Sequence, residues 1–179
     1  MKKVTVLFLA ILMMIPSLSM NAKETTRNEE KAYQLYQLGL FSGESNVSYI
    51  PNLEGETNRE QAMVMLSKMF AWNEIGPENC AFLDVSSWAK SAVATAFERG
   101  VTSGIGNNQF GGANYITERQ VISWITRELG YDNPYNNIYI ARDIGLIDYE
   151  TADRITKDIA NKKEKRLIRD DLVGYFYKS

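Results

Sequence analysis

The chain has 179 residues, with 20 Lys and Arg against 22 Asp and Glu, no histidine, and Cys80 as its one cysteine. The absence of histidine excludes Ser-His-Asp and Cys-His nucleophiles, histidine-ligated zinc and histidine general bases. One cysteine excludes internal disulfides and metal-binding cysteine clusters, and the slightly acidic charge argues against a basic surface for nucleic acid.

The first 22 residues have the order of an export signal. Lys2 and Lys3 precede an apolar run over residues 4–15, and Pro16 and a small-residue stretch ending at Ala22 follow. Twelve apolar residues are too few to span a bilayer, which needs about 20. We therefore expect a signal peptide over 1–22, no transmembrane segment, and a secreted mature chain. Because that peptide carries two lysines and no acid, the formal charge falls from −2 to −4.

The mature chain repeats one pattern three times. A short amphipathic segment that ends in glycine and an apolar residue occurs over 33–40, 93–101 and 140–146. A polar loop and a second amphipathic segment follow each one, over 59–70, 119–129 and 169–177. One short helical pair cannot bury its apolar face alone, so the three pairs must share a core. The sequence predicts a mostly α fold of three helix-loop-helix repeats, over 29–75, 80–131 and 134–179.

The ends of the first helix in the middle unit carry local signals. Apolar residues over 89–97 recur at helical spacing and give one buried stripe. Gly100 stands where a left-handed C-terminal cap is expected, and Ser87 is expected to be the N-cap. These signals predict a helix between Ser87 and Gly100.

The second helices of the first two units begin with capping-box patterns. Asn58 is followed three residues later by Gln61, and Thr117 by Gln120. In the third unit Ile168 stands at the corresponding position and offers no such cap, so the start of that helix is less well defined by the sequence.

The middle unit resembles a known repeat. Residues 82–89 read Phe-Leu-Asp-Val-Ser-Ser-Trp-Ala, residues 100–104 read Gly-Val-Thr-Ser-Gly, and Phe110, Ile116 and Thr117 follow. Residues 57–62 of the first unit read Thr-Asn-Arg-Glu-Gln-Ala, and residues 167–172 of the third read Leu-Ile-Arg-Asp-Asp-Leu. This order is similar to the S-layer homology repeat, a module of exported proteins of Gram-positive bacteria.

The resemblance implies a pseudo-threefold spindle, in which three repeats surround a shared helical core. It also implies non-covalent binding of secondary cell-wall polysaccharide, often bearing acidic pyruvate ketals, in grooves between adjacent repeats. On this basis we expect a protein of the cell wall or cell surface that is not an enzyme and uses no metal or cofactor.

The resemblance also points to the residues of a glycan site. By position, Arg59 would bind the acidic group, Asp84 and Trp88 would close the same groove, and Arg169 would be the counterpart in the third unit. A first-turn arginine joins a planar donor fork to the positive end of a helix, which suits a carboxylate, and an indole face can cover a sugar ring. On this reading, Arg59→Ala weakens binding and barely changes the melting temperature.

The three residues of the first proposed groove each have a structural alternative. Arg59 could pair with a neighbouring glutamate in solvent, Asp84 could cap a turn, and Trp88 could be part of the core. In the second unit the family's arginine position is Glu118, with Arg119 one place later, so an acidic ligand would be repelled there.

Two other functions compete with glycan binding. A degenerate repeat scaffold could bind another surface protein without binding sugar. A hydrolase could use a pair of carboxylates among Glu54, Glu56, Asp84 and Glu118, but nothing in their spacing favours a catalytic pair.

Overall fold

The computed structural model describes residues 28–42, 48–131, 133 and 136–177, and the expected signal peptide lies outside them. Over this part the fold is mostly helical, as predicted, and it contains isolated β-bridges but no sheet. The helices are α2 (Glu29–Gln37), α3 (Arg59–Met69), the short 3-10 helix η1 (Pro77–Asn79), α4 (Lys90–Glu98), α5 (Glu118–Glu128), α6 (Asn137–Asp143), α7 (Tyr149–Ala160) and α8 (Arg169–Phe176). No helix among the described residues is long and apolar enough to cross a membrane.

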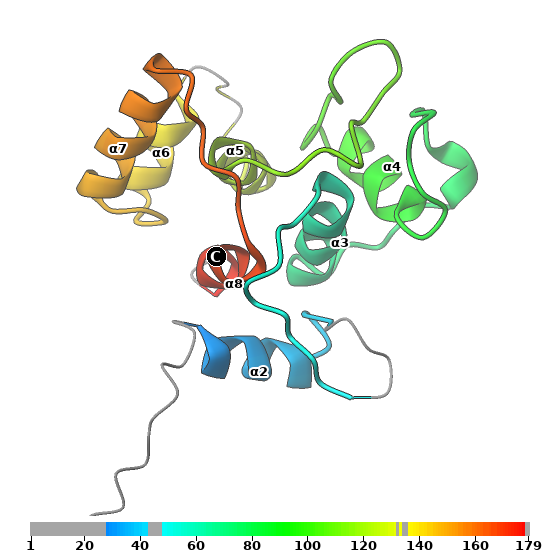
Figure 1. Ribbon diagram of the computed structural model, residues 1–179. Helices are drawn as coiled ribbons and strands as arrows, with labels where there is room; N and C mark the ends of the chain where they lie inside the picture. The colour runs from blue at the N-terminus through cyan, green and yellow to red at the C-terminus, as the bar shows by residue number, and fades with distance from the viewer. Residues whose placement is uncertain (1–27, 43–47, 132, 134–135, 178–179) are drawn as a thin grey trace, which may run out of the picture.

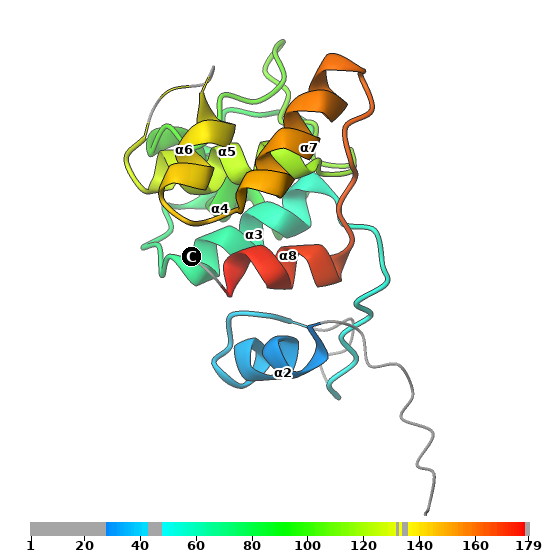
Figure 2. The ribbon, with the colours of Figure 1, turned by 90° about the vertical axis from the view of Figure 1, so that its left-hand side faces the viewer.

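Three helices, α3, α5 and α8, lie at the centre of the molecule, and the other helices surround them (Figure 1). The view at right angles places α3 beside α8, with α2 packed on the outside (Figure 2). The central helices supply fully or almost fully buried side chains to one hydrophobic core: Met63 and Leu66, Val121, Ile122 and Ile125, and Leu172, Val173 and Phe176.

The segments that lead into the three central helices are joined by a closed cycle of backbone hydrogen bonds. The N–H of Thr57 donates to the carbonyl of Leu167 (3.2 Å), that of Leu167 to Ile116 (3.0 Å), and that of Ile116 back to Thr57 (2.9 Å). All three residues are completely buried, so these polar groups need protein partners. Each segment is therefore both donor and acceptor, and no segment completes the cycle without the other two.

The outer helix of each unit ends in the same way. Gly39, Gly100 and Gly145 have positive φ angles of 73°, 74° and 79°, a conformation that is costly for residues with a Cβ. Their N–H groups bond to carbonyls in the last helical turn, and the N–H of the next residue reaches one residue further back. These are the bonds of a Schellman motif, and the C-cap predicted at Gly100 is confirmed.

The N-cap predicted at Ser87 is wrong. The helix α4 begins at Lys90, and Ala89 holds the N-cap position without a side-chain hydrogen bond. The reason is an extra turn before the helix, in which the N–H of Ala89 donates to the carbonyl of Ser86 (2.9 Å).

The central helices start with side-chain caps. Asn58 and Gln61 form the predicted capping box of α3, and the N–H of Thr117 donates to the side chain of Gln120 at 3.1 Å. In α8 the N–H of Ile168 donates to the carboxylate of Asp171, three residues later, at 3.2 Å. The cap that the sequence did not reveal in the third unit is thus supplied from inside the helix.

The third unit contains a helix that the sequence analysis missed. In place of one polar loop, α7 stands between α6 and α8. Asp148 caps it by accepting from the N–H of Thr151 at 2.7 Å, and Ala152 and Ile155 bury its inner face. The signal was present in the sequence as an aspartate followed by apolar residues at helical spacing.

The helices α2 and α8, which lie far apart in the sequence, contact each other. The backbone and side-chain nitrogens of Asn28, just before α2, donate to the side chain and carbonyl of Asp170 in α8, at 3.0–3.1 Å. The hydroxyl of Tyr177 donates to the side chain of Gln34 at 2.8 Å. The helix α2 therefore packs on the third unit as well as belonging to the first.

Candidate functional site

The side chain of Arg59 is enclosed. Only 3 % of the residue is exposed, and its guanidinium carbon lies 4.8 Å from the ring centre of Phe110 and 5.0 Å from that of Trp124. Its Nε donates to the carbonyl of Phe110 at 3.0 Å. Burial lowers the pKa of Arg59 to about 10, while the charge of Asp84 acts in the opposite direction. The side chain is therefore still protonated at neutral pH, and it fastens α3 to the loop of the middle unit.

The carboxylate of Asp84 holds the same loop. One oxygen accepts from the N–H of Phe110 at 2.7 Å and the other from the N–H of Gly111 at 2.8 Å. Burial raises the pKa of Asp84, but hydrogen bonds from backbone amides, those of Phe110 and Gly111 first, lower it by more, and the net pKa is below the usual value. The carboxylate thus stabilises the loop on which Arg59 rests.

The contribution of Asp84 to stability should disappear in acid. Because the folded-state pKa is depressed, the stabilisation is present above the ordinary pKa of about 3.9 and is lost as the pH falls through the folded value. At neutral pH we expect Asp84→Asn to cost about 1 kcal/mol, a modest figure because the residue is exposed to solvent. Urea unfolding of both proteins at pH 7 and pH 3 measures this, and an unchanged difference at pH 3 would contradict it.

Trp88 is 56 % exposed and is therefore not a core residue. It lines a groove of about 340 Å3 between the units, which we call the Trp88 groove. The other lining residues come from the segment that follows α2, from α3 and from the start of α8: Leu40, Ser42, Gln61, Val64, Met65, Lys68 and Arg169. The structure thus brings Trp88 together with Arg169, and Arg59 is not among the lining residues.

Two cations face the Trp88 groove. The Nε of Arg169 donates to the carbonyl of Pro51 at 2.9 Å, and its guanidinium lies 4.9 Å from the ring centre of Phe41. Its environment therefore corresponds to that of Arg59, and it gives the groove wall a fixed positive charge. The ammonium of Lys68 has three donors, one of which reaches the hydroxyl of Ser42 at 3.0 Å. No carboxylate is among the lining residues.

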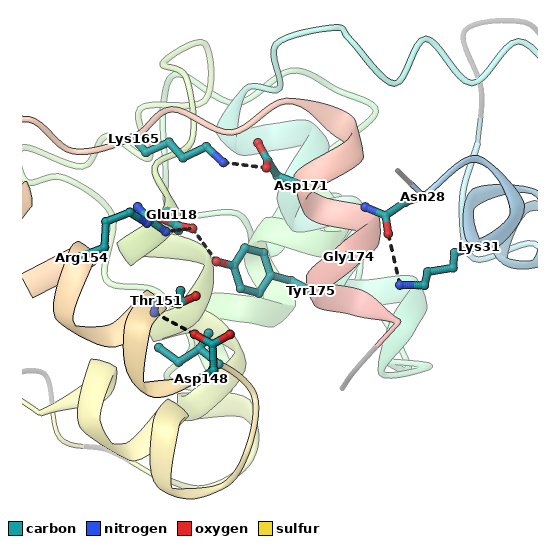
Figure 3. A pocket seen from close by; sticks show the side chains of 11 residues that line it. Asn28, Lys31, Glu118, Asp148, Thr151, Arg154, Lys165, Asp171, Gly174 and Tyr175 are labelled. Atoms are coloured by element: carbon teal, nitrogen blue, oxygen red, sulfur yellow. Dashed lines mark hydrogen bonds and ion pairs between the residues drawn. The ribbon is translucent and has the colours of Figure 1, made fainter. Parts of the chain in front are cut away.

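A second groove, of about 630 Å3, lies between α7, α8 and the start of α2, and Figure 3 shows its side chains. We call it the Glu118 groove. It is lined by residues at the start of α2, in and before α7, at the start of α5, and in and before α8: Asn28, Lys31, Ile147, Asp148, Thr151, Arg154, Glu118, Lys165, Asp171, Gly174 and Tyr175. Like the Trp88 groove, it is lined by residues of all three units, but by different ones.

The two grooves draw on equivalent positions. In each, three residues hold the second, fifth and sixth places after the first residue of a central helix: Gln61, Val64 and Met65 in α3, and Asp171, Gly174 and Tyr175 in α8. In each, one further residue begins another central helix: Arg169 of α8 in the Trp88 groove and Glu118 of α5 in the Glu118 groove. The side chain at this shared position is positively charged in the Trp88 groove and negatively charged in the Glu118 groove.

Glu118 is held firmly by its neighbours. It is 4 % exposed, and its Oε1 accepts from Arg154 at 2.8 Å and from the hydroxyl of Tyr175 at 2.5 Å. Figure 3 shows the carboxylate between these two side chains, which come from α7 and α8. Burial, and then the hydrogen bond to Glu118, raise the pKa of Tyr175 well above its usual range. The hydroxyl therefore stays protonated and continues to donate.

Of the four residues proposed from the sequence, the structure places two on one open groove. Trp88 and Arg169 share the Trp88 groove, while Arg59 is buried and Asp84 is bonded to the backbone of its own unit. The sequence analysis overlooked Lys68. Its signal was the spacing of residues 61, 64, 65 and 68, which puts all four on one face of α3.

Comparison with known proteins gives two matches. A family model described as the S-layer homology domain matches residues 81–122, which span Asp84, Trp88, α4 and the start of α5. A cell surface protein of Thermoanaerobacter kivui is 25 % identical over 123 residues. The aligned region covers 64 % of this chain and 16 % of that relative, so the chain corresponds to about a sixth of its length. The resemblance to S-layer homology repeats is thus confirmed for the middle unit.

Proposed function

We propose that this chain is a non-enzymatic cell-surface module of three S-layer-homology-like repeats, which binds acidic cell-wall polysaccharide in the Trp88 groove. The observation that carries the proposal is an exposed indole beside Lys68 and Arg169 in a groove without carboxylates. The matches to the S-layer homology domain and to a cell surface protein support the surface location.

The three-repeat spindle is supported by the hydrogen-bond cycle of Thr57, Ile116 and Leu167. Three segments that each precede a central helix make the same bond to the next segment in turn. The glycine caps at the ends of the outer helices recur with nearly equal φ angles. Equivalent lining positions in the two grooves follow from such a pseudo-threefold arrangement.

The chemistry of the Trp88 groove suits a sugar that carries a carboxylate, such as a pyruvate ketal. The exposed face of Trp88 can lie against the C–H side of a sugar ring. Lys68 can donate to the carboxylate, and the charge of Arg169 adds attraction. Arg59 and Asp84 act indirectly in this proposal. Both side chains hydrogen-bond to the backbone of Phe110 and so hold the loop of the middle unit in place.

Trp88→Ala should weaken binding of the purified chain to isolated Gram-positive wall sacculi about tenfold. Loss of a stacking contact of roughly 1–2 kcal/mol accounts for this factor. The measurement is the fraction of protein that pellets with increasing amounts of sacculi. Leu83→Ala is the matched control, since Leu83 is 84 % exposed in the same segment and lies outside the groove.

The same assay separates the competing functions. Sacculi from which the non-peptidoglycan polymer has been extracted should no longer pellet the protein. Undiminished pelleting of the folded Trp88→Ala variant would remove Trp88 from the site. Indifference to wall polymer, together with a crosslinked protein partner, would favour the scaffold function instead.

A further inference from the structure

A carboxyl group of α3 holds the turn that carries Trp88. Glu60 is the second residue of α3 and is only 4 % exposed. Its Oε1 accepts from the N–H of Ser86 at 2.8 Å, and the carbonyl of Ser86 accepts in turn from the N–H of Ala89 at 2.9 Å. Trp88 lies inside this turn, so the hydrogen bond from Ser86 joins the segment of the indole to α3.

The side chain of Glu60 fits closely against Gly112. The N–H of Glu60 donates to the carbonyl of Gly112 at 3.3 Å, and a Cβ at Gly112 would overlap the carboxyl group. Gly112 is not among the glycines with a positive φ angle, so the structure needs a glycine here for space. A side chain enclosed in this way has few alternative rotamers, and the direction of its hydrogen bond is therefore fixed.

The first unit shows the same contact without the extra turn. Asp170 is the second residue of α8, the place that Glu60 has in α3, and its carboxylate accepts from the N–H of Asn28 at 3.0 Å. Asn28 is the N-cap of α2 itself, whereas Ser86 stands three residues before Ala89, the N-cap of α4. The middle unit thus inserts one turn between the bonded N–H and its helix, and that turn carries the indole of the groove.

The place of this turn sets the distance between the indole and α3. Among the described residues that line the Trp88 groove, Trp88 is the one that belongs to the middle unit, and most of the others belong to α3. Glu60 is part of the same helix, so its bond to Ser86 ties these two parts of the groove together. A binding site needs its groups held within about 0.5 Å of the productive geometry.

We propose that Glu60 is a positioning residue for the Trp88 groove, which holds the indole at the distance from α3 that the ligand requires. Glu60 is not itself a lining residue, so it acts through Trp88. The effect on binding rests on the proposed function, whereas the placement of the indole can be measured without a ligand.

Fluorine NMR of the full chain, labelled with fluorotryptophan, tests the placement of the indole. The chain has three tryptophans, and single replacements by phenylalanine assign their signals. Glu60→Ala should shift or broaden the signal of Trp88 and leave unchanged that of Trp72, which lies beyond the other end of α3. Glu60→Gln should keep the Trp88 signal in place, because the amide oxygen can still accept from Ser86.

The pelleting assay with sacculi tests the effect on binding. Glu60→Ala should weaken binding about fivefold, less than Trp88→Ala because the indole remains, and Glu60→Gln should bind within about twofold of the unmodified chain. Added to Trp88→Ala, the Glu60→Ala change should alter binding by less than about twofold, since its effect passes through the indole. Gly112→Ala displaces the carboxyl group without removing it, and it should act like Glu60→Ala in both backgrounds.

Asp148→Ala is the stability control. It removes the side-chain cap of α7 and so destabilises the fold, but Asp148 lies outside the Trp88 groove. This variant should keep the Trp88 signal in place and should bind sacculi within about twofold of the unmodified chain.

An unchanged Trp88 signal in folded Glu60→Ala would overturn the inference, and so would an equal loss of binding with and without Trp88. Glu60 would then only stabilise the fold. If the unmodified chain does not pellet with sacculi, the proposed function fails. In that case a Trp88 signal that moves in Glu60→Ala and returns in Glu60→Gln still supports the positioning of the indole.

Discussion

Arg59→Ala is expected to lower the free energy of unfolding by about 3 kcal/mol or more, which is large for one substitution. The change removes a buried side chain that packs against the rings of Phe110 and Trp124, and it leaves a cavity there. It also removes the donor to the buried carbonyl of Phe110, and a buried acceptor without a partner costs about 1–3 kcal/mol. Denaturation with guanidinium chloride, followed by tryptophan fluorescence, measures the loss.

Arg59→Met provides the matched control. Methionine fills much of the volume beside the two rings but supplies no donor, so it should cost less than alanine. If the free energy of unfolding of Arg59→Ala lies within about 0.5 kcal/mol of that of the unmodified chain, the side chain is not structural. The result would then favour the binding role expected from the sequence. The burial of Arg59 thus leads to a large expected loss of stability, whereas the sequence led us to expect weaker binding and a nearly unchanged melting temperature.

Glu118→Arg should also destabilise the fold strongly, by about 3 kcal/mol or more. The substitution places a guanidinium next to that of Arg154, which now lies 2.8 Å from the Glu118 carboxylate. It also removes the acceptor of the buried Tyr175 hydroxyl. Breaking a buried charge pair from one side costs about 3–5 kcal/mol, and the partial exposure of Arg154 favours the lower end of that range. The same unfolding assay applies.

A charge exchange tests the cause of this loss. Adding Arg154→Glu to Glu118→Arg restores opposite charges across the contact and should recover a substantial part of the stability. Arg119→Glu, one residue away and paired with Glu164 on the surface, is a control that should not rescue the variant. Equal stability of the single and double variants would show that the size of the new side chain, and not its charge, causes the damage.

The helices were largely predictable because their signals are local. Glycine at Gly100 fixes a helix end within a few residues, and Asn58 with Gln61 fixes a helix start. The predicted bounds of the three central helices lie within one residue of those observed, whereas α2 and α6 begin three to four residues before the predicted segments and α7 was missed. The helix α7 was missed because the repeat pattern assigned a loop to that place, and the pattern was given more weight than the apolar spacing.

The grooves were less predictable because they depend on contacts between distant residues. A first-turn arginine is usually solvated, and Arg59 is enclosed because Phe110 and Trp124, 51 and 65 residues later, lie against it. Trp88 and Arg169 likewise line one groove although they are 81 residues apart in the chain. Family position identified both residues but paired Trp88 with Arg59, because it follows the order of the repeats along the chain and carries no direct information on side-chain enclosure.

The contacts between α2 and α8 constrain the time at which the molecule can close. Asn28 and Asp170 are 142 residues apart in the chain, so the hydrogen bonds between them cannot form until α8 has been synthesised. Contacts this distant in sequence form slowly, because a long loop must be ordered before they stabilise anything. The packing of α2 on α8 therefore forms only after α8 has been synthesised, and it is expected to be a late step of folding.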